Sequence, residues 1–568
     1  MIVGIDLGTT NSLVAIFRGE KAEIIPNRLG EKLTPSVVSF GEDGTVYVGK
    51  TAKERSILYP DRTVSLFKRY MGSSKEYEIG YDVFTPSDIA SILLRTLKED
   101  AEEYLGEKIT DAIISVPAYF NDEQRKATKL AGYLAGLNVE RIISEPTAAA
   151  VAYGIENKEI NTRFLVFDLG GGTFDVSILE KYEHIMEVRA VAGDNHIGGE
   201  DFTDTLIKMF IKENGLDINN IDRKTYAYIR KQAENAKCNL GTEKEIKITC
   251  NIDEEYYESV FSIDEYEAEC KSLLERIRKP IERTLRDAKL KIADIDEIIL
   301  VGGGTRLSIV RKYVSRLFGR IPNCELDAEE VVAMGVSISA AMQENNKEIK
   351  EVILTDVCAF SLGTEIVTIK NNSVEQGHFL PIIDRNTVIP VSKNQTLYTA
   401  NDNQETIRIR ILQGESRHAK NNMLIGEIVT KVPKNEAGKE SIDVTYTYDI
   451  NAVLEVEIKV NSTKEKTRVV FKGNSLCYSQ EEIEKRLEEL SYLKISPRDE
   501  EKNKHILFRA ERLYEELLGD DRIKIERYIS DLEDALDMKD KLLIERKREE
   551  LKNFMTLIEE ENDIFLYS

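Results

Sequence analysis

The sequence predicts a multidomain protein in which a duplicated, two-lobed α/β domain is followed by an antiparallel β domain and then by an α-helical region. A strand, an Asp-Leu-Gly turn and a second strand around Asp6 are repeated around Asp168, which indicates two related lobes. Apolar and polar residues alternate in 407–411 and 454–460, as in antiparallel sheets with one buried face. A helical period returns after Ser479 and continues, with many charges, to the end of the chain.

Composition indicates an ordinary globular protein and disfavours some partners. Of the 568 residues, 42% are hydrophobic and 32% are charged, and the net charge of −23 disfavours binding to nucleic acid or to an anionic membrane. No apolar run approaches the roughly 20 residues that span a bilayer. The six cysteines form no Cys-x-x-Cys pair and the five histidines are dispersed, so a metal site built from them is not expected. The first residues have strand character rather than that of a secretory signal, and we expect a cytoplasmic protein.

The stretch from Asp168 to Asp175, Asp-Leu-Gly-Gly-Gly-Thr-Phe-Asp, predicts a strand, a tight glycine turn and a second strand. Glycines allow backbone N–H groups to approach a ligand closely, and a cluster of such groups suits a phosphate. The carboxylates at both ends are then placed to hold a cation or a water beside that phosphate. Taken alone, the stretch equally describes a hairpin with acidic ends on a solvated edge.

Two further turns favour the phosphate interpretation. Residues 3–17 contain the matching strand, Asp-Leu-Gly turn and strand, so two facing turns could hold a triphosphate and its Mg²⁺ from both sides. Residues 298–306 form a third strand followed by a glycine turn. Sugar and base also need close approach of the backbone, which makes the third turn consistent with a nucleotide.

Helices and strands alternate between these turns. We expect a helix from Thr85-Pro86 to Gly106, a strand at 112–116 ended by Pro117, a helix from Asn121 to Gly136, and a strand at 141–144. Such alternation predicts sheets covered by helices on both faces. Glu145 follows the last of these strands, at the carboxyl end where α/β proteins collect their ligands.

The middle of the chain is mainly helical and strongly charged, apart from an alternating stretch near 245–263. In the amphipathic helix expected at 228–240, Glu234 and Lys237 are three residues apart and share a face. By itself this pair indicates a solvated ion pair on the protein surface.

A change of pattern marks the end of the α/β domain. The apolar segment with acidic flanks at 348–356 is the expected boundary. In the C-terminal region, Ser479 and Glu482 form a capping box, and Gly519 with its neighbouring aspartates separates two helical pieces. We expect this region to be a helical hairpin or a small bundle.

Together these motifs resemble the seventy-kilodalton heat-shock chaperones, the DnaK family, over nearly the whole chain. The segments that carry the resemblance are 4–12, 116–120, 145–150, 167–175, 198–202 and 301–303. The resemblance implies an actin-like ATPase domain over 1–347, an interdomain linker over 348–358, a β-sandwich substrate-binding domain over 359–472 and a shortened α-helical lid over 473–568. The short stretch from Phe67 to Thr85 and the short helical tail are similar to the divergent bacterial HscC branch.

The resemblance also implies roles for individual residues around ATP or ADP. The implied nucleotide contacts are Gly8, Thr9, Thr10, Asn11, Gly170, Gly171, Gly172, Gly199, Glu200, Glu234, Lys237, Gly302, Gly303 and Arg306, the last stacking on the base. Asp6, Glu145 and Asp168 would orient Mg²⁺ through its water shell, since Mg²⁺ keeps several waters, and K⁺ is a further candidate ion. Lys68 would stabilise charge at the γ-phosphate, while Thr173 and Asp175 would position the attacking water.

A peptide groove and a switch are implied in the same way. The matching groove positions are Leu362, Thr364, Val367, Leu397, Ala400, Ile407 and Ile409. An extended peptide would bond there through its backbone, with one apolar side chain in a central pocket, although packing in the β core explains Ile409 nearly as well. Pro117 and Arg125 match the switch that reports the nucleotide state, and Arg141 and Asp356 match positions used for a J-domain partner and for interdomain docking.

Four residues depart from the family pattern. Gly241 stands where a serine near the nucleotide is usual, and Thr355 replaces an apolar linker residue. Val367 replaces a methionine of the groove, and Ala452 replaces a loop glycine. Nucleotide affinity and peptide preference are therefore not transferable from the family.

The implied function is that of an ATP-dependent molecular chaperone that binds extended apolar segments of unfolded proteins, with ATP hydrolysis closing the groove and the lid. A J-domain co-chaperone is an expected partner, and the need for a nucleotide exchange factor is left open. One alternative is an actin-like or sugar-kinase-like protein, which shares the duplicated turns but needs neither the β domain nor the helical tail. Another is a slowly cycling regulator, which the complete set of Lys68 and its surrounding acidic residues disfavours.

Overall fold

The structure is a computed structural model of the whole chain. It describes residues 1–19, 21–156, 161–182, 185–240, 245–252, 255–344, 353–370, 373–449, 454–471, 494–495, 498–517, 519–538 and 541–567. The predictions that concern Gly241, Ala452, the first five residues of the expected linker and the capping box at Ser479 lie outside these ranges.

The first lobe is built on a sheet with the strand order β11-β10-β1-β2-β3, to which β4 is added beside β2. Its strands are β1 (Ile2–Asp6), β2 (Asn11–Arg18), β3 (Lys21–Ile25), β4 (Thr34–Pro35), β10 (Asp111–Val116) and β11 (Asn138–Ser144). β1 pairs antiparallel with β2 and parallel with β10. The helices α2 (Pro86–Leu105) and α3 (Asp122–Leu134) pack together beside this sheet, and both begin at the capping residues expected from the sequence, Thr85 and Asn121.

The second lobe repeats this arrangement with the order β17-β12-β13-β14-β18-β21. Its strands are β12 (Asn161–Leu169), β13 (Phe174–Tyr182), β14 (Ile185–Asp194), β17 (Glu297–Val301), β18 (Ile353–Val357) and β21 (Val388–Ile389). As in the first lobe, an antiparallel pair (β12 and β13) is extended by a parallel strand (β17). The duplication predicted from the two Asp-Leu-Gly turns is confirmed.

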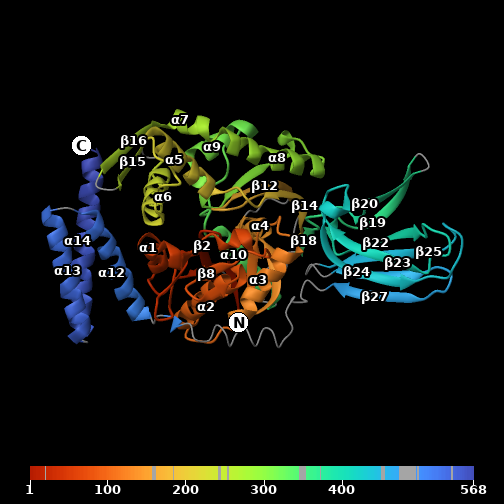
Figure 1. Cartoon of the computed structure of the whole chain (residues 1–568), viewed down its shortest axis with the longest axis horizontal. Coiled ribbons are helices and arrows are strands. Elements are labelled where there is room, and N and C mark those ends of the chain that lie inside the picture. Colours follow the sequence, from red (N-terminus) through yellow and green to blue (C-terminus); the bar gives the residue numbers. More distant parts are fainter. Residues whose placement is uncertain are drawn as a thin grey trace.

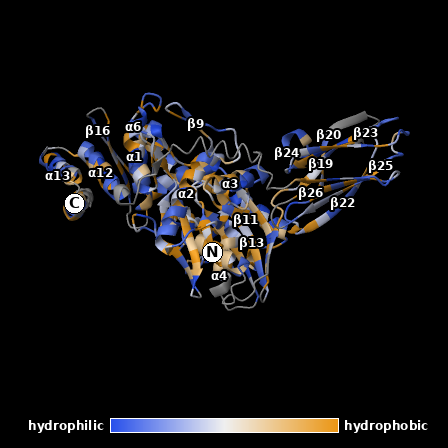
Figure 2. Cartoon of the chain, turned by 90° about the horizontal axis from the view of Figure 1, so that it is seen from below, coloured by the Kyte–Doolittle hydropathy of each residue, from blue (hydrophilic) through white to orange (hydrophobic). Residues whose placement is uncertain are grey.

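Two helices, α4 (Glu145–Glu156) and α10 (Val331–Gln343), lie between the sheets. They pack closely because small residues face each other: a Cβ at Gly335 would collide with the carbonyl of Ala148, and one at Gly4 would collide with the backbone of Ser337. Figure 2 shows apolar residues gathered around α4 and the strands β11 and β13 near it. This helix pair holds the two lobes in register.

Further elements complete both lobes. In the first lobe these are β5 (Val38–Phe40), β6 (Thr45–Val48), α1 (Lys50–Leu58), β7 (Thr63–Val64), the 3₁₀ helix η2 (Phe67–Tyr70), β8 (Tyr77–Ile79) and β9 (Asp82–Phe84). In the second lobe they are α5 (Gly199–Glu213), α6 (Arg223–Cys238), β15 (Glu245–Ile252), β16 (Glu255–Ser262), α7 (Ile263–Glu269), α8 (Lys271–Ala288), the 3₁₀ helix η4 (Gly303–Arg306) and α9 (Ser308–Phe318).

The β region contains two four-stranded antiparallel sheets that enclose one apolar core. One sheet has the order β20-β19-β23-β24, with β19 (Leu362–Lys370), β20 (Ser373–Ile383), β23 (Thr406–Gln413) and β24 (Met423–Lys431). The other has the order β22-β25-β26-β27, with β22 (Val391–Tyr398), β25 (Ser441–Tyr448), β26 (Leu454–Val460) and β27 (Lys466–Phe471). Tyr446 links the sheets, since its hydroxyl donates a 3.0 Å hydrogen bond to the carbonyl of Gly363.

Part of the expected linker is a strand of the second lobe. Residues 353–357 form β18, which pairs parallel with β14 and antiparallel with β21. The edge of β14 offers unpaired backbone groups, which explains why an apolar segment extends the sheet there. The β region is joined to the second lobe by a further contact, in which Arg385 donates hydrogen bonds of 2.8 and 3.0 Å to Asp287.

In the part of the helical region that the structure describes, α12 (Arg498–Glu516), α13 (Gly519–Met538) and α14 (Lys541–Tyr567) form a bundle with its own apolar core. It lies at the opposite end of the molecule from the β region (Figure 1). α12 packs along α1, where the guanidinium of Arg55 lies 4.3, 4.4 and 4.7 Å from the ring centres of Tyr47, Tyr59 and Phe508. Among the described helices, none is both long and apolar enough to cross a membrane.

We expect Phe508→Ala to loosen the packing of α12 against α1. The Phe508 ring meets Tyr47 and Tyr59 edge-on, with ring centres 5.6 and 6.5 Å apart. Because Phe508 is only partly buried, its loss should cost roughly 1–3 kcal/mol, less than a fully buried phenylalanine. Hydrogen exchange within α1 should therefore become faster. Leu557→Ala, on an exposed position of α14, is the control, and equal exchange in both variants would contradict the prediction.

Candidate functional site

The three glycine turns predicted from the sequence meet at one pocket between the lobes. The described residues that line it are Asp6, Gly8, Thr9, Thr10, Asn11, Leu13, Leu33, Lys68, Glu145, Asp168, Gly170, Gly171, Thr173, Val301, Gly302, Gly303, Ala328, Glu329 and Val332. The turns follow β1, β12 and β17, and strand pairing fixes their relative positions because β12 lies beside β17 with Asp168 opposite Val301. The turns are therefore recognisable in the sequence, and the fold brings them together.

The first and second glycine turns are in direct contact. A Cβ at Gly171 would collide with the side chain of Thr10, and a Cβ at Gly172 would lie 2.6 Å from Cγ2 of Thr9. Only glycine allows the two turns to approach so closely. The backbone of the second turn is thereby exposed to the pocket, as a phosphate-binding turn requires.

Four acidic residues, Asp6, Glu145, Asp168 and Asp175, are buried in and beside this pocket. Burial, reinforced by Glu145, raises the pKa of Asp6 to about 6, although Lys68 and the Ser115 hydroxyl oppose the shift. Burial and then Glu145, Asp175 and Asp6 raise the pKa of Asp168 well above its usual range. Burial and then Glu145 raise the pKa of Asp175 to about 8.

Among the described residues that line the pocket, Lys68 is the only one with a positively charged side chain. That side chain is only 2% exposed. Its Nζ donates a 2.6 Å hydrogen bond to Oε1 of Glu145. One ammonium therefore faces four carboxyl groups. The Oδ2 atoms of Asp168 and Asp175 are buried without a hydrogen-bond partner.

This chemistry fits a further cation beside an anionic ligand. Two buried carboxylate oxygens lack partners, and burial first, then repulsion by neighbouring carboxylates, raises the pKa of Asp168 and Asp175. A Mg²⁺ ion would relieve that repulsion. Within the described residues, no group of three or more His, Cys, Asp or Glu side chains is arranged to ligate a metal directly. The expected contact of Asp6, Glu145 and Asp168 with Mg²⁺ through its water shell stays a prediction.

Several predicted nucleotide contacts lie beside the pocket rather than in its lining. Lys237 donates to Glu234 (2.6 Å), to Thr203 and to the Gly199 carbonyl (3.0 Å), and its side chain is 8% exposed. The ion pair with Glu234 is present, but the prediction that it is solvated is wrong for Lys237. Its ammonium is buried because α6 packs against the N-terminal turn of α5. Glu200, also in that turn, is paired with Arg230.

Arg306 is held by two acidic residues that the sequence analysis did not single out. Its guanidinium lies 2.8 Å from Asp327 and 3.0 Å from Glu329, and its side chain is 51% exposed. Oε1 of Glu329 also accepts a 3.3 Å hydrogen bond from Asn11, across the pocket. No local motif marks Glu329, since it reaches the site only through the fold. The stacking of Arg306 on a base stays a prediction.

Ser115 is a second residue that the sequence did not mark. It is fully buried at the end of β10, and its hydroxyl donates a 2.6 Å hydrogen bond to Oδ1 of Asp6. The pairing of Asp6 with Ser115 across neighbouring parallel strands creates this contact. The only available signal would have been a polar residue in an otherwise apolar strand.

The predicted groove residues divide into two groups. Leu362, Thr364, Ile407 and Ile409 are buried in the β region, and Ile409 belongs to its core, as the alternative interpretation expected. Leu397 is partly buried against that core, whereas Val367 is 40% exposed and Ala400 is exposed. Contact of these residues with a peptide stays a prediction.

The predicted switch residues lie between the pocket and the β region. Pro117 follows β10, and Arg125 on α3 donates a 3.2 Å hydrogen bond to the Phe120 carbonyl. Desolvation raises the pKa of Asp356 on β18, an effect opposed by Arg125 and Arg141, so the structure brings these three charges together. Burial lowers the pKa of Arg141, and Asp356 opposes that shift.

The fold and the site define a class of protein: a two-lobed α/β protein with a pocket between duplicated glycine turns, whose backbone groups suit an anionic ligand. The model of the Hsp70 protein family matches residues 2–82 and 74–563. The chain is 39% identical to the chaperone protein DnaK of Thermosipho melanesiensis, over 98% of this chain and 96% of that protein. It is also 39% identical to the chaperone protein DnaK of Thermotoga neapolitana, over 95% of this chain and 93% of that protein. The chain therefore belongs to the Hsp70 family.

The resemblance stated from the motifs is thus confirmed at the level of the family. The relatives named above do not test the similarity to the HscC branch, which stays a prediction. The β region and all but the last residues of the helical region lie within the matched residues, so the family match is not limited to the two lobes.

We expect Asp175→Asn to stabilise the nucleotide-free protein at high pH but not at low pH. The pKa of about 8 in the folded protein lies above the usual 3.8, so stability falls progressively as the pH rises from about 3.8, where the unfolded chain loses this proton, to about 8, where the folded protein loses it too. Asparagine keeps the oxygen that accepts a 3.2 Å hydrogen bond from the Tyr119 amide.

The measurement is the free energy of unfolding of both proteins near pH 4 and near pH 8.5. Since one pKa unit corresponds to about 1.4 kcal/mol, we expect the variant to gain at least ~2 kcal/mol at the higher pH. Asp82→Asn, at an exposed position, is the control. A difference between Asp175→Asn and wild type that does not grow with pH would refute the expected effect.

Proposed function

We propose that this chain is an ATP-dependent molecular chaperone that binds extended apolar segments of unfolded polypeptides. The observation that carries the proposal is the meeting of two glycine turns at a buried acidic pocket, in a chain that matches DnaK chaperones over nearly its whole length. Family membership over the β and helical regions also argues against a filament-forming or sugar-phosphorylating protein, which would need only the two lobes.

In this proposal, the pocket binds ATP or ADP. Backbone groups of the first turn (Thr9, Thr10, Asn11) and of the second turn (170–172) hold the phosphates. Asp6, Glu145 and Asp168 hold the water shell of Mg²⁺, and the ion would offset negative charge on the phosphates. The remaining predicted contacts, on α5, α6 and η4, would bind the ribose and the base.

Lys68 and Asp175 have the chemistry that hydrolysis requires. The ammonium of Lys68 is buried and already oriented by Glu145, so it can stabilise charge on a phosphoryl group without first losing a hydration shell. The unpartnered Oδ2 of Asp175 can accept a hydrogen bond from an attacking water. Thr173, buried in the same turn, would help to position that water.

The proposed domains are those expected from the sequence: an ATPase domain over 1–347, a linker over 348–358, a substrate-binding domain over 359–472 and a lid over 473–568. Contacts between the ATPase domain and the substrate-binding domain support coupling between the nucleotide state of the first and the conformation of the second. Oδ1 of Asp175 accepts a hydrogen bond from the amide of Tyr119, and the ring of Tyr119 lies 4.4 Å from that of Phe360 in the β region. A change at the phosphate end of the pocket can thus reach the β region through one residue.

The partners follow from the same proposal. Unfolded or extended polypeptides are the clients, with Val367 and Ala400 as exposed groove positions and the buried groove residues behind them. A J-domain co-chaperone would act near Arg141 and Asp356. The cytoplasm is the proposed location, and neither nucleic acid nor membrane is a proposed partner, given the net charge of −23.

We expect Lys68→Ala to retain ATP binding and to lose hydrolysis. The variant removes the buried ammonium and leaves the glycine turns intact, so the rate of a single turnover should fall roughly 100-fold or more. ATP binding is measured by equilibrium titration, and cleavage by rapid mixing with limiting ATP. Lys108→Ala, which removes an exposed lysine of the same lobe, is the control. Unchanged cleavage in Lys68→Ala would exclude the role given to Lys68.

The experiment that tests the whole proposal is ATP turnover with and without an extended apolar peptide. We expect the peptide to stimulate turnover several-fold, because binding in the β region would be reported to the pocket through the contacts around Tyr119. A peptide of equal length with its apolar residues replaced by charged ones should have no effect. ATP-dependent filaments, or transfer of phosphate to a sugar, would instead favour the alternative classes.

A further inference from the structure

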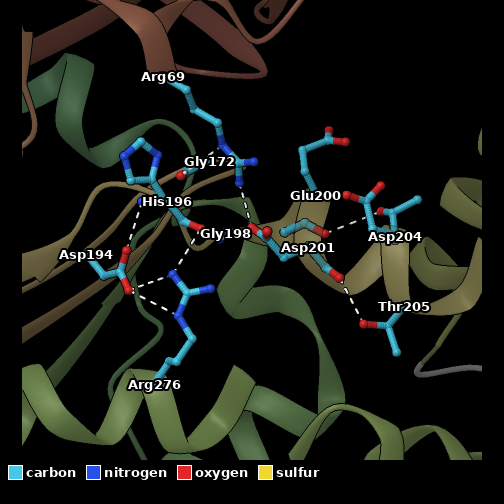
Figure 3. Close-up of polar contacts among 12 residues, drawn as sticks. Arg69, Gly172, Asp194, His196, Gly198, Glu200, Asp201, Asp204, Thr205 and Arg276 are labelled. Atoms are coloured by element: carbon cyan, nitrogen blue, oxygen red, sulfur yellow. Dashed lines mark hydrogen bonds and ion pairs between the residues drawn. The ribbon is translucent and has the colours of Figure 1, made fainter. Parts of the chain in front are cut away.

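One arginine of the first lobe crosses to the second lobe beside the pocket (Figure 3). Nε of Arg69 donates a 3.1 Å hydrogen bond to the carbonyl of Gly172, and its terminal nitrogen donates a 2.6 Å hydrogen bond to Oδ2 of Asp201. We call these two contacts the Arg69 bridge. They connect η2, in the first lobe, to the second glycine turn and to the first turn of α5, both in the second lobe.

The two ends of the bridge in the second lobe belong to one hydrogen-bonded unit. The amides of Gly199 and Glu200 donate 2.9 Å hydrogen bonds to the carbonyls of Gly170 and Gly171, which joins the start of α5 to the glycine turn. Oδ2 of Asp201 also accepts a 2.8 Å hydrogen bond from the Gly198 amide. Arg69 therefore contacts one hydrogen-bonded unit of the second lobe at two points, the Gly172 carbonyl and the Asp201 carboxylate.

On the first-lobe side, Arg69 is the direct neighbour of Lys68. Both residues lie in η2, a single 3₁₀ turn that follows Leu66 in the left-handed conformation (φ 56°). The turn is closed by a hydrogen bond from the Met71 amide to the Lys68 carbonyl. Lys68 is directed into the pocket and Arg69 to the opposite lobe, so movement of one lobe relative to the other must displace both.

The bridge is not an ordinary surface ion pair. Exposed pairs contribute little, because water screens them and their side chains lose conformational freedom. The side chains of Arg69 and Asp201 are 14% and 20% exposed, and Arg69 has a second, backbone contact. A Cβ at Gly172 would lie 2.6 Å from Nε of Arg69, so any larger residue at that position would have to displace the guanidinium.

We propose that Arg69 is a positioning residue that holds the two lobes closed around the nucleotide and thereby holds Lys68 at the phosphates. The proposal rests on the nucleotide-binding function proposed above. The Arg69 side chain does not line the pocket, so it acts through Lys68 and through the second glycine turn. Its loss leaves the phosphate-binding turns in place while weakening the contact that keeps them together.

A neighbouring arginine provides the control. Arg276, on α8, pairs with Asp194 at 2.7 Å and donates a 3.2 Å hydrogen bond to the His196 carbonyl, as Figure 3 shows. All three of these residues are in the second lobe. Arg276→Ala therefore removes the same charge and the same side-chain volume in the region that Figure 3 shows, but it removes no contact between the lobes.

The first test measures release of a fluorescent ADP analogue and single-turnover hydrolysis at saturating ATP. In Arg69→Ala we expect release to be roughly tenfold faster or more, since a charge-assisted contact and a second hydrogen bond are both lost. Hydrolysis at saturating ATP should also fall several-fold, because Lys68 is less often in place. Arg276→Ala should match wild type in both measurements. Equal release in Arg69→Ala and Arg276→Ala would overturn the proposal.

The second test asks whether the partner is Asp201. Asp201→Asn is combined with Arg69→Ala, and release of the ADP analogue is measured in both single variants and the double variant. If the bridge acts as proposed, Asp201→Asn accelerates release less in the Arg69→Ala background than in wild type. Additive effects would overturn the assignment. Arg69→Lys keeps the charge but cannot make both contacts, and so should restore release only in part, whereas full restoration would show that the Gly172 contact is not needed.

A third measurement separates failure of the bridge from failure of the proposed function. Hydrogen exchange of residues 66–72 and 170–173 is followed in the nucleotide-free protein, where the bridge is present without a ligand. Arg69→Ala should exchange faster in both segments, and Arg276→Ala should not. If wild type neither binds nor hydrolyses ATP, the proposed function fails, and this measurement still decides whether the bridge joins the lobes. Unchanged exchange in a folded Arg69→Ala protein would refute the bridge itself.

Discussion

The arrangement of charge in the pocket is the constraint on which the rest of the structure depends. Asp6, Glu145, Asp168 and Asp175 come from both lobes and are buried around one ammonium, that of Lys68. Such an excess of buried negative charge is unfavourable unless a cation accompanies it, and burial, together with repulsion between the carboxyl groups, raises the pKa of three of the four groups. Apolar packing elsewhere offsets the free-energy cost of burying this charge, above all the packing of the helix pair α4 and α10 between the sheets. A pocket of this kind is poised to respond to its ligand.

The two ends of the molecule contact the lobes in different ways. The β region is joined by strand pairing and by polar contacts such as that of Arg385 with Asp287. The helical region is joined through α12, which contacts the first lobe at Arg55 and the second lobe at Lys224, paired with Glu515 at 2.6 Å. Because α12 touches both lobes, their relative position and the seating of the helices are coupled. The ligand pocket lies between these two attachment regions.

Features that depend on neighbouring residues were predictable from the sequence, and features that depend on distant contacts were not. The hairpins around Asp6 and Asp168 and the boundaries of α2 were expected, because turn and capping residues determine them locally. The burial of Lys237 and the role of Glu329 were not, since each depends on an element far away in the chain. The pairing of β18 with β14 was missed for the same reason: a sheet edge recruits a strand by its backbone, which leaves no pattern of side chains.

The pairing of β18 also determines the length of free chain that connects the second lobe to the β region. While residues 353–357 are part of the sheet, they cannot serve as connecting chain between the second lobe and the β region. Five residues released from a sheet span at most roughly 17 Å when fully extended. Separation of β18 from β14 would therefore lengthen the tether of the β region by no more than about that distance. The length of chain paired at the sheet edge therefore limits how far the β region can move away from the lobes before the connecting chain is fully extended.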